Sequence, residues 1–123
     1  MHIKHLNDSP QFIAGDESHL REILNPRKHE IQANYSLAWA MVKPGERTLQ
    51  HALTSTEVYF ILKGTGKMHI GNEVSVVREH DTIYIPPNAV QFIENIDNEN
   101  LEFLCIVHPA WQPEVEHIVD TVT

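Results

Sequence analysis

Residues 35–107 are divided into short segments suited to β-strands, and each segment is stopped by residues that form turns. Glu57–Leu62 is rich in β-branched and aromatic residues and is followed by a turn at Gly64. Tyr35–Val42 carries its large apolar residues at nearly alternate positions, which is the period of a strand with one buried face. Short strands at this close spacing predict an almost entirely β chain, folded as a sandwich or a closed barrel.

The remaining segments of this region fit the same interpretation. Lys67–Ile70 and Val74–Val77 are interpreted as a hairpin around Gly71-Asn72-Glu73. Asp81–Ile85 predicts a short strand that ends at two prolines. Leu101–Val107 is almost continuously apolar, so we expect a well buried strand there.

The two ends of the chain carry weaker signals. Leu20–Leu24 suits either one helical turn or a short strand, and Asn25-Pro26 ends it in both cases, because the residue before proline is pushed out of the α region. Residues 114–120 are compatible with one helical turn. No internal repeat and no low-complexity segment interrupts the chain.

Composition narrows the class of protein. A chain of 123 residues suits one domain with a substantial core. Seventeen acidic against nine basic residues give a net charge of −8, which argues against nucleic acid or an anionic membrane as the partner. The single cysteine, Cys105, has no intrachain disulfide partner and is expected to be a small apolar filler. With no signal-peptide pattern and no membrane-spanning apolar run, we expect a cytoplasmic protein.

The stretch Gly45–Gly64 contains the residues most suited to chemistry. His51 and Glu57 fall on two successive strands, and we expect them on adjacent strands with their side chains converging inside the barrel. Because side chains two residues apart on a strand share a face, Leu53 lies on the face of His51, and Tyr59 lies on the face of Glu57. A carboxylate is costly to bury without a partner, and a metal ion shared with His51 would provide one.

The same stretch resembles the first motif of the cupins, usually written G-x5-H-x-H-x3–4-E-x6-G. Four positions match with the right spacing, namely Gly45, His51, Glu57 and Gly64. Leu53 stands where the second histidine belongs. The second cupin motif, G-x5-P-x-G-x2-H-x3-N, is matched at Pro86 and Asn95 but carries His80, Asn88 and Gln91 in place of Gly, Gly and His.

This resemblance implies the fold and its divisions. We expect a single-domain, all-β cupin jelly roll, also called a double-stranded β-helix. Residues 1–34 would form an N-terminal arm with short strands, residues 35–108 the barrel and residues 109–123 a C-terminal tail. Small cupins often dimerise through such an arm, so the resemblance also implies a homodimer.

The resemblance further implies a divalent metal ion in the barrel mouth. Carried over position by position, the metal ligands are His51, Glu57 and Gln91, whereas Leu53 contributes none. Zn, Mn, Fe and Ni all suit such a site, and the open positions would accept water or substrate. Each residue also has a plain structural alternative. His51 and Tyr59 suit hydrogen-bonded core positions, Glu57 suits a solvent-facing strand end, and Gln91 suits a polar group that binds a ligand through its amide.

Three functions follow as hypotheses. The first is a metal-dependent cupin that acts on a small polar organic molecule as an isomerase, lyase, decarboxylase or dioxygenase. Glu57 and Tyr59 are then the candidate catalytic residues. The second is a metal-free module that binds a small ligand without catalysis. The third is metal-free acid–base catalysis by Glu57 and His51.

Overall fold

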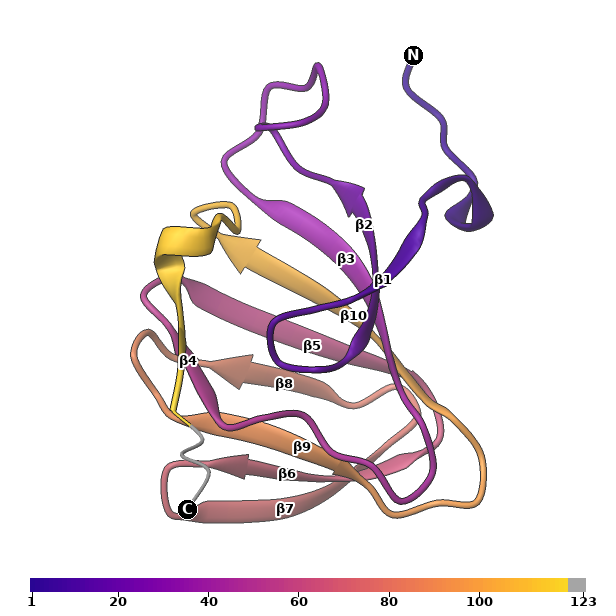
Figure 1. The fold of residues 1–123 in the computed structure, drawn as a ribbon, viewed down its shortest axis with the longest axis vertical. Helices are drawn as coiled ribbons and strands as arrows, with labels where there is room; N and C mark the ends of the chain where they lie inside the picture. The colour runs from indigo at the N-terminus through magenta and orange to yellow at the C-terminus, as the bar shows by residue number, and fades with distance from the viewer. Residues whose placement is uncertain (120–123) are drawn as a thin grey trace.

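The computed structural model describes residues 1–119, and it consists almost entirely of strands arranged in two antiparallel sheets (Figure 1). The larger sheet has the order β1-β2-β3-β10-β5-β8. Its strands are β1 (Gln11–Ile13), β2 (His19–Leu24), β3 (Ser36–Val42), β10 (Leu101–His108), β5 (Thr56–Lys63) and β8 (Thr82–Ile85). The predicted all-β fold is confirmed.

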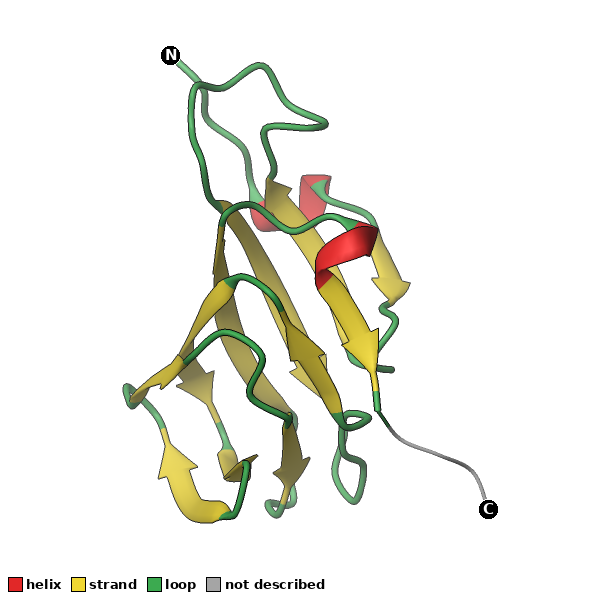
Figure 2. Cartoon of the chain, turned by 90° about the vertical axis from the view of Figure 1, so that its left-hand side faces the viewer, coloured by secondary structure: helices red, strands yellow, loops and turns green. Residues whose placement is uncertain are grey.

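The smaller sheet has the order β11-β4-β9-β6-β7 and packs against the larger one. Its strands are β11 (Glu116–Ile118), β4 (His51–Leu53), β9 (Gln91–Asn95), β6 (Thr65–Ile70) and β7 (Glu73–Arg78). The expected hairpin is present, since β6 and β7 pair from Thr65↔Arg78 to Ile70↔Glu73. Figure 2 shows that helical structure in the described chain is confined to short turns beside the strands.

The core lies between the two sheets and consists of the inward-facing side chains of their strands. Tyr59 and Ile61 of β5, Phe103 of β10 and Ile93 of β9 are at most 2% exposed. The expected burial of Leu101–Val107 holds at alternate positions of β10, where Leu101, Phe103, Cys105 and Val107 are buried, whereas Ile106 points outward and is 40% exposed. A sheet covered on one face buries only every second residue, even where the sequence is apolar at all of them.

Both ends of the chain become strands of the sheets. Leu20–Leu24 lies within β2, so the strand interpretation is confirmed and the helical one was wrong. The helical turn expected over residues 114–120 is present only as a 3-10 turn at Pro113–Val115. The next residues form β11, which pairs with β4, whereas residue 120 lies outside the described part of the chain. No helix among residues 1–119 is long and apolar enough to cross a membrane.

The turn between β1 and β2 folds over the opening between the sheets (Figure 1). It is closed by hydrogen bonds from Ala14 N–H to the Ser18 carbonyl and from Glu17 N–H to the Ala14 carbonyl. It is tied to the segment that precedes β4 by Leu49 N–H, which donates to the Asp16 carbonyl at 2.8 Å. This contact brings an N-terminal carboxylate to the segment that carries His51.

Candidate active site

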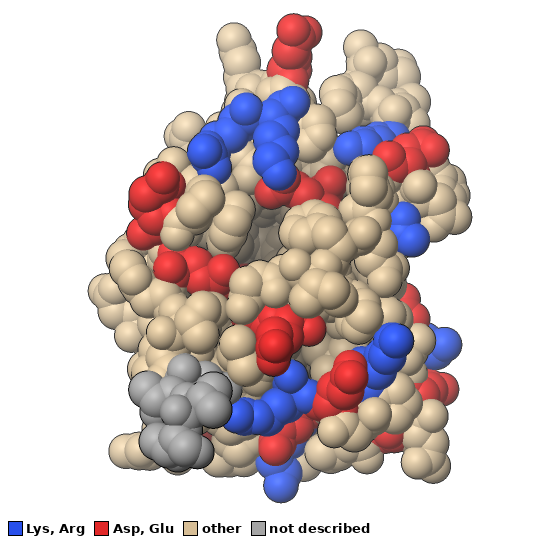
Figure 3. All heavy atoms as spheres, in the orientation of Figure 1, with Lys and Arg blue, Asp and Glu red and all other residues tan. Residues whose placement is uncertain are grey.

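A cavity of about 200 Å³ opens at the end of the barrel covered by this turn. Apolar side chains form most of its walls, among them Leu20, Ala38, Leu53, Phe103, Val107 and Trp111. Its ionisable groups include Asp16, His51, Glu57 and Glu116. Figure 3 shows a hollow in this face of the molecule with acidic side chains around it. The cavity is large enough for a small organic molecule and is polar on one side.

His51 and Glu57 line this same cavity, and both are buried, at 2% and 7% exposure. The expected convergence inside the barrel is therefore present. The expected adjacency of their strands was wrong, because β4 belongs to the smaller sheet and β5 to the larger one. The two residues face each other across the barrel, since the short Thr54-Ser55 link carries the chain from one sheet to the other. Leu53 also lines the cavity, on the same strand face as His51.

The carboxyl group of Glu57 is held by one specific hydrogen bond. The Gln91 side-chain amide donates from Nε2 to Glu57 Oε1 at 2.7 Å. Burial raises the pKa of Glu57 to about 7, while the charge of His51 and this hydrogen bond act in the opposite direction. Glu57 therefore exchanges a proton near neutral pH, which is the property required of a general acid or base.

Tyr59 fixes the orientation of the Gln91 amide. Its hydroxyl donates to Gln91 Oε1 at 3.1 Å, so the amide nitrogen must point towards Glu57. Burial, followed by the charge of Glu57, raises the pKa of Tyr59 well above its usual value. Both ends of the amide are thus engaged within the protein. We propose that Tyr59 and Gln91 position Glu57, in place of the catalytic and metal-binding roles that the sequence suggested for them.

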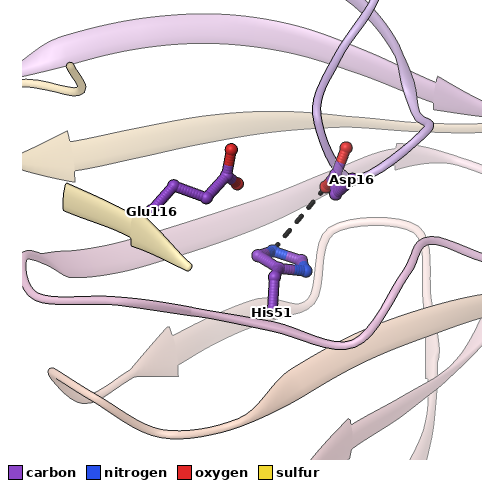
Figure 4. Close-up of side chains that lie close together, drawn as sticks. All are labelled: Asp16, His51 and Glu116. Atoms are coloured by element: carbon purple, nitrogen blue, oxygen red, sulfur yellow. Dashed lines mark ion pairs between the residues drawn. The ribbon is translucent and has the colours of Figure 1, made fainter. Parts of the chain in front are cut away.

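His51 presents a single ring nitrogen to the cavity. Its Nδ1 lies 2.7 Å from the Leu49 carbonyl, which only accepts hydrogen bonds, so Nδ1 carries the proton. In the neutral ring the Nε2 lone pair is then free, and Nε2 lies 3.6 Å from Asp16 Oδ2 (Figure 4). A backbone carbonyl that fixes the tautomer in this way is a common companion of metal-binding histidines.

Two carboxylates that sequence reasoning missed complete this corner of the cavity. Asp16 comes from the β1–β2 turn and Glu116 from the first position of β11. One atom from each of Asp16, His51 and Glu116 lies within 4.8 Å of the others, so these residues could hold a metal ion (Figure 4). Burial, followed by the charge of Asp16, raises the pKa of Glu116, while His51 and a hydrogen bond from Trp111 oppose this. No spacing signal could have found them, because they come from opposite ends of the chain.

Residues 38–107 match the cupin domain family. The chain belongs to the cupin family. An uncharacterised protein of Methanocaldococcus jannaschii is 42% identical over 110 residues, which cover 89% of this chain and 87% of that protein. Asp16 and Glu116 both lie outside the matched cupin segment.

Solved structures confirm the cupin fold at low sequence identity. The polyketide cyclase RemF from Streptomyces resistomycificus superposes with a TM-score of 0.82 at 16% identity, covering 99% of this chain and 87% of that chain. An oxalate decarboxylase from Lactobacillus farciminis superposes with a TM-score of 0.80 at 21% identity, covering 94% of this chain and 35% of that chain. At these identities the likeness concerns the fold alone.

Proposed function

We propose that this cupin is an enzyme that binds a small organic molecule in the cavity and transfers a proton on it through Glu57. One observation carries the proposal: a buried carboxyl group lines a 200 Å³ cavity and, among residues 1–119, receives a hydrogen bond at only one of its oxygens, Oε1. A carboxylate fixed in this way can accept a proton through Oε2 without losing its position. The pKa of about 7 supports the same role.

The arrangement suits proton transfer next to a carbonyl group. As the carboxylate, Glu57 would take a proton from the carbon beside the carbonyl, and the electron pair of that C–H bond would move into the enolate. As the carboxylic acid, it would return the proton to the same carbon or to another one. Among the chemistries considered for this fold, isomerases and lyases need such a group. The apolar walls would hold the carbon skeleton and exclude water from the transfer.

The experiment follows exchange of the central C–H protons of 1,3-diketones in D₂O by NMR. Acetylacetone and cyclohexane-1,3-dione are small enough for the cavity, and their acidic C–H groups report proton removal directly. We expect the native protein to accelerate exchange above the buffer rate, and Glu57→Gln to lower that acceleration by about 100-fold or more. The substitution is isosteric and keeps an oxygen acceptor for Gln91. Glu94→Gln, outside the cavity, is the matched control and should leave the rate unchanged.

A second function, ligand binding without catalysis, is favoured by the largely apolar lining. The same NMR experiment separates the two. Binding without catalysis predicts chemical-shift changes for cavity residues on diketone addition but equal exchange rates in the native protein and in Glu57→Gln. That result would overturn the proposed proton transfer, as would exchange by the native protein no faster than in buffer.

A further inference from the structure

Two of the four metal-ligand positions of the cupin motifs, Leu53 and Gln91, are poorly suited to hold a metal in this chain. Leu53 has no donor atom. The carbonyl oxygen of Gln91 accepts from Tyr59, and its amide nitrogen, which cannot coordinate a metal, holds Glu57 Oε1. A metal at Gln91 would have to share the carbonyl oxygen with the Tyr59 hydroxyl, or displace that hydroxyl at a cost of about 1–3 kcal/mol for a group left unsatisfied. Of the four motif positions, His51 alone presents a free nitrogen donor.

We infer that this chain binds a divalent metal ion at a different site, formed by Asp16, His51 and Glu116. The three donor atoms lie within 4.8 Å of one another. Metal bonds to imidazole nitrogen and carboxylate oxygen measure about 2.0–2.2 Å, so one ion can reach two donors up to roughly 4.2 Å apart. His51 Nε2 and Asp16 Oδ2, at 3.6 Å, satisfy this distance without movement.

Two of the three donors are held in place by hydrogen bonds on the side away from the site. The Leu49 carbonyl holds His51 Nδ1, so Nε2 faces the two carboxylates. Asp16 Oδ1 accepts from the Ser18 N–H at 3.0 Å and the Ser18 hydroxyl at 2.7 Å, which leaves Oδ2 for the ion. Supporting contacts of this kind orient ligands before a metal binds, and they distinguish a built site from a chance cluster.

The excess of carboxyl groups around the site also favours binding of a cation. Asp16, Glu22, Glu57 and Glu116 bring four carboxyl groups to one cavity. Among the described residues that line it, Lys28 is the one lysine or arginine, and it pairs with Glu22 at 2.7 Å. Within residues 1–119, no lysine or arginine of the cavity wall therefore balances Asp16 and Glu116. A divalent ion would balance both charges, because its charge of +2 equals the sum of two carboxylates.

The donor set indicates the class of metal. One imidazole and two carboxylates form a mixed nitrogen and oxygen site, which suits Mn²⁺, Fe²⁺ or Zn²⁺ better than the sulfur-preferring Cu⁺. Three protein ligands leave coordination positions open to the cavity. The site also joins an N-terminal turn, a barrel strand and a C-terminal strand, so metal binding stabilises the packing of both chain ends on the barrel.

The test is isothermal titration calorimetry with MnCl₂ and ZnCl₂ on the full chain after chelator treatment and dialysis. The native protein should bind one ion, and Asp16→Asn and Glu116→Gln should each weaken binding at least tenfold. Both substitutions remove charge without changing size, and in Asp16→Asn the side-chain amide oxygen would still accept from Ser18. Circular dichroism and urea unfolding of the metal-free variants establish that they fold.

Two further variants show whether the metal ion binds at the inferred site or at the cupin-motif positions. Glu57→Gln should leave the metal affinity within about threefold of native, because Glu57 is outside the inferred ligand set. Glu94→Gln breaks the surface ion pair between His69 and Glu94, at 2.9 Å, and is the matched histidine–carboxylate control. A large loss in Glu57→Gln with none in Asp16→Asn would overturn the inference in favour of the motif positions. Failure of the folded native protein to bind either ion would also overturn it. Neither result depends on whether Glu57 transfers protons.

Discussion

The burial of Glu57 makes a quantitative prediction for folding stability against pH. Its pKa rises from 4.5 to about 7 on folding, mainly because burial disfavours the charged form. A raised carboxyl pKa stabilises the fold fully below pH 4.5, and that contribution is lost as pH rises through about 7. At 1.36 kcal/mol per pKa unit, the whole effect is about 3 kcal/mol.

Glu57→Gln removes this dependence while retaining a similar shape and an acceptor for Gln91. We expect the unfolding free energy of the native protein, minus that of the variant, to fall by about 2–3 kcal/mol between pH 5 and pH 8. Urea unfolding of both metal-free proteins, followed by circular dichroism at several pH values, measures it. Subtraction removes the contributions to stability that both proteins share.

A difference that stays constant from pH 5 to pH 8 would refute the reasoning. It would mean that Glu57 has similar proton affinities in the folded and unfolded chains, so that the Gln91 hydrogen bond and His51 offset the effect of burial, or that water reaches the carboxyl group. A difference that grows with pH would mean that Glu57 is stabilised as the carboxylate. The Gln91 bond and His51 would then outweigh burial.

Three other predictions concern the supporting contacts, the metal and the assembly. Tyr59→Phe removes the donor to Gln91 and should lower the unfolding free energy by about 1–3 kcal/mol in urea titrations; an unchanged value would show that the hydroxyl is dispensable. Leu53→His adds an imidazole beside His51 on the cavity wall and should tighten Zn²⁺ binding at least tenfold by calorimetry; equal or weaker binding would show that position 53 cannot reach the ion. The homodimer expected from the family predicts twice the chain mass in light scattering. Ile106 lies on the exposed face of β10, and Ile106→Glu should halve that mass if this face forms the dimer interface. A variant that remains dimeric would show that this face is not the interface.

The assembled site depends on the ends of the chain as much as on the cupin motifs. His51 lies in the matched segment, whereas Asp16 and Glu116 lie before and after it. The β1–β2 turn and β11 bring these carboxylates to the barrel mouth through pairing with the sheets and through the Leu49–Asp16 hydrogen bond. Relatives that share the barrel but differ in these end segments should therefore differ in metal affinity.

Between residues 35 and 107, the local pattern of the sequence indicated most of the strands and, where apolar and polar residues alternate, which side of a strand faces inward; it did not indicate β11, where a helical turn was expected. Alternation from residue to residue sets the exposed and buried faces, so the shared faces of His51 with Leu53 and of Glu57 with Tyr59 could be predicted. The turn at Gly64 could also be predicted, because its φ of +89° is costly for other residues. These features depend on neighbours a few positions away, and a sequence displays them directly.

Tertiary structure alone decided the partners of each polar group. The division of β4 and β5 between two sheets set His51 opposite Glu57, which the short distance between them in the sequence did not reveal. Gln91 lies on β9 and its hydrogen-bond partners, Tyr59 and Glu57, lie on β5. These two strands are far apart in the sequence. The meeting of Asp16 with Glu116 depends on both chain ends closing one barrel. A hydrogen bond or a metal bond acts over about 2–3 Å, so it is defined only when every strand has its place.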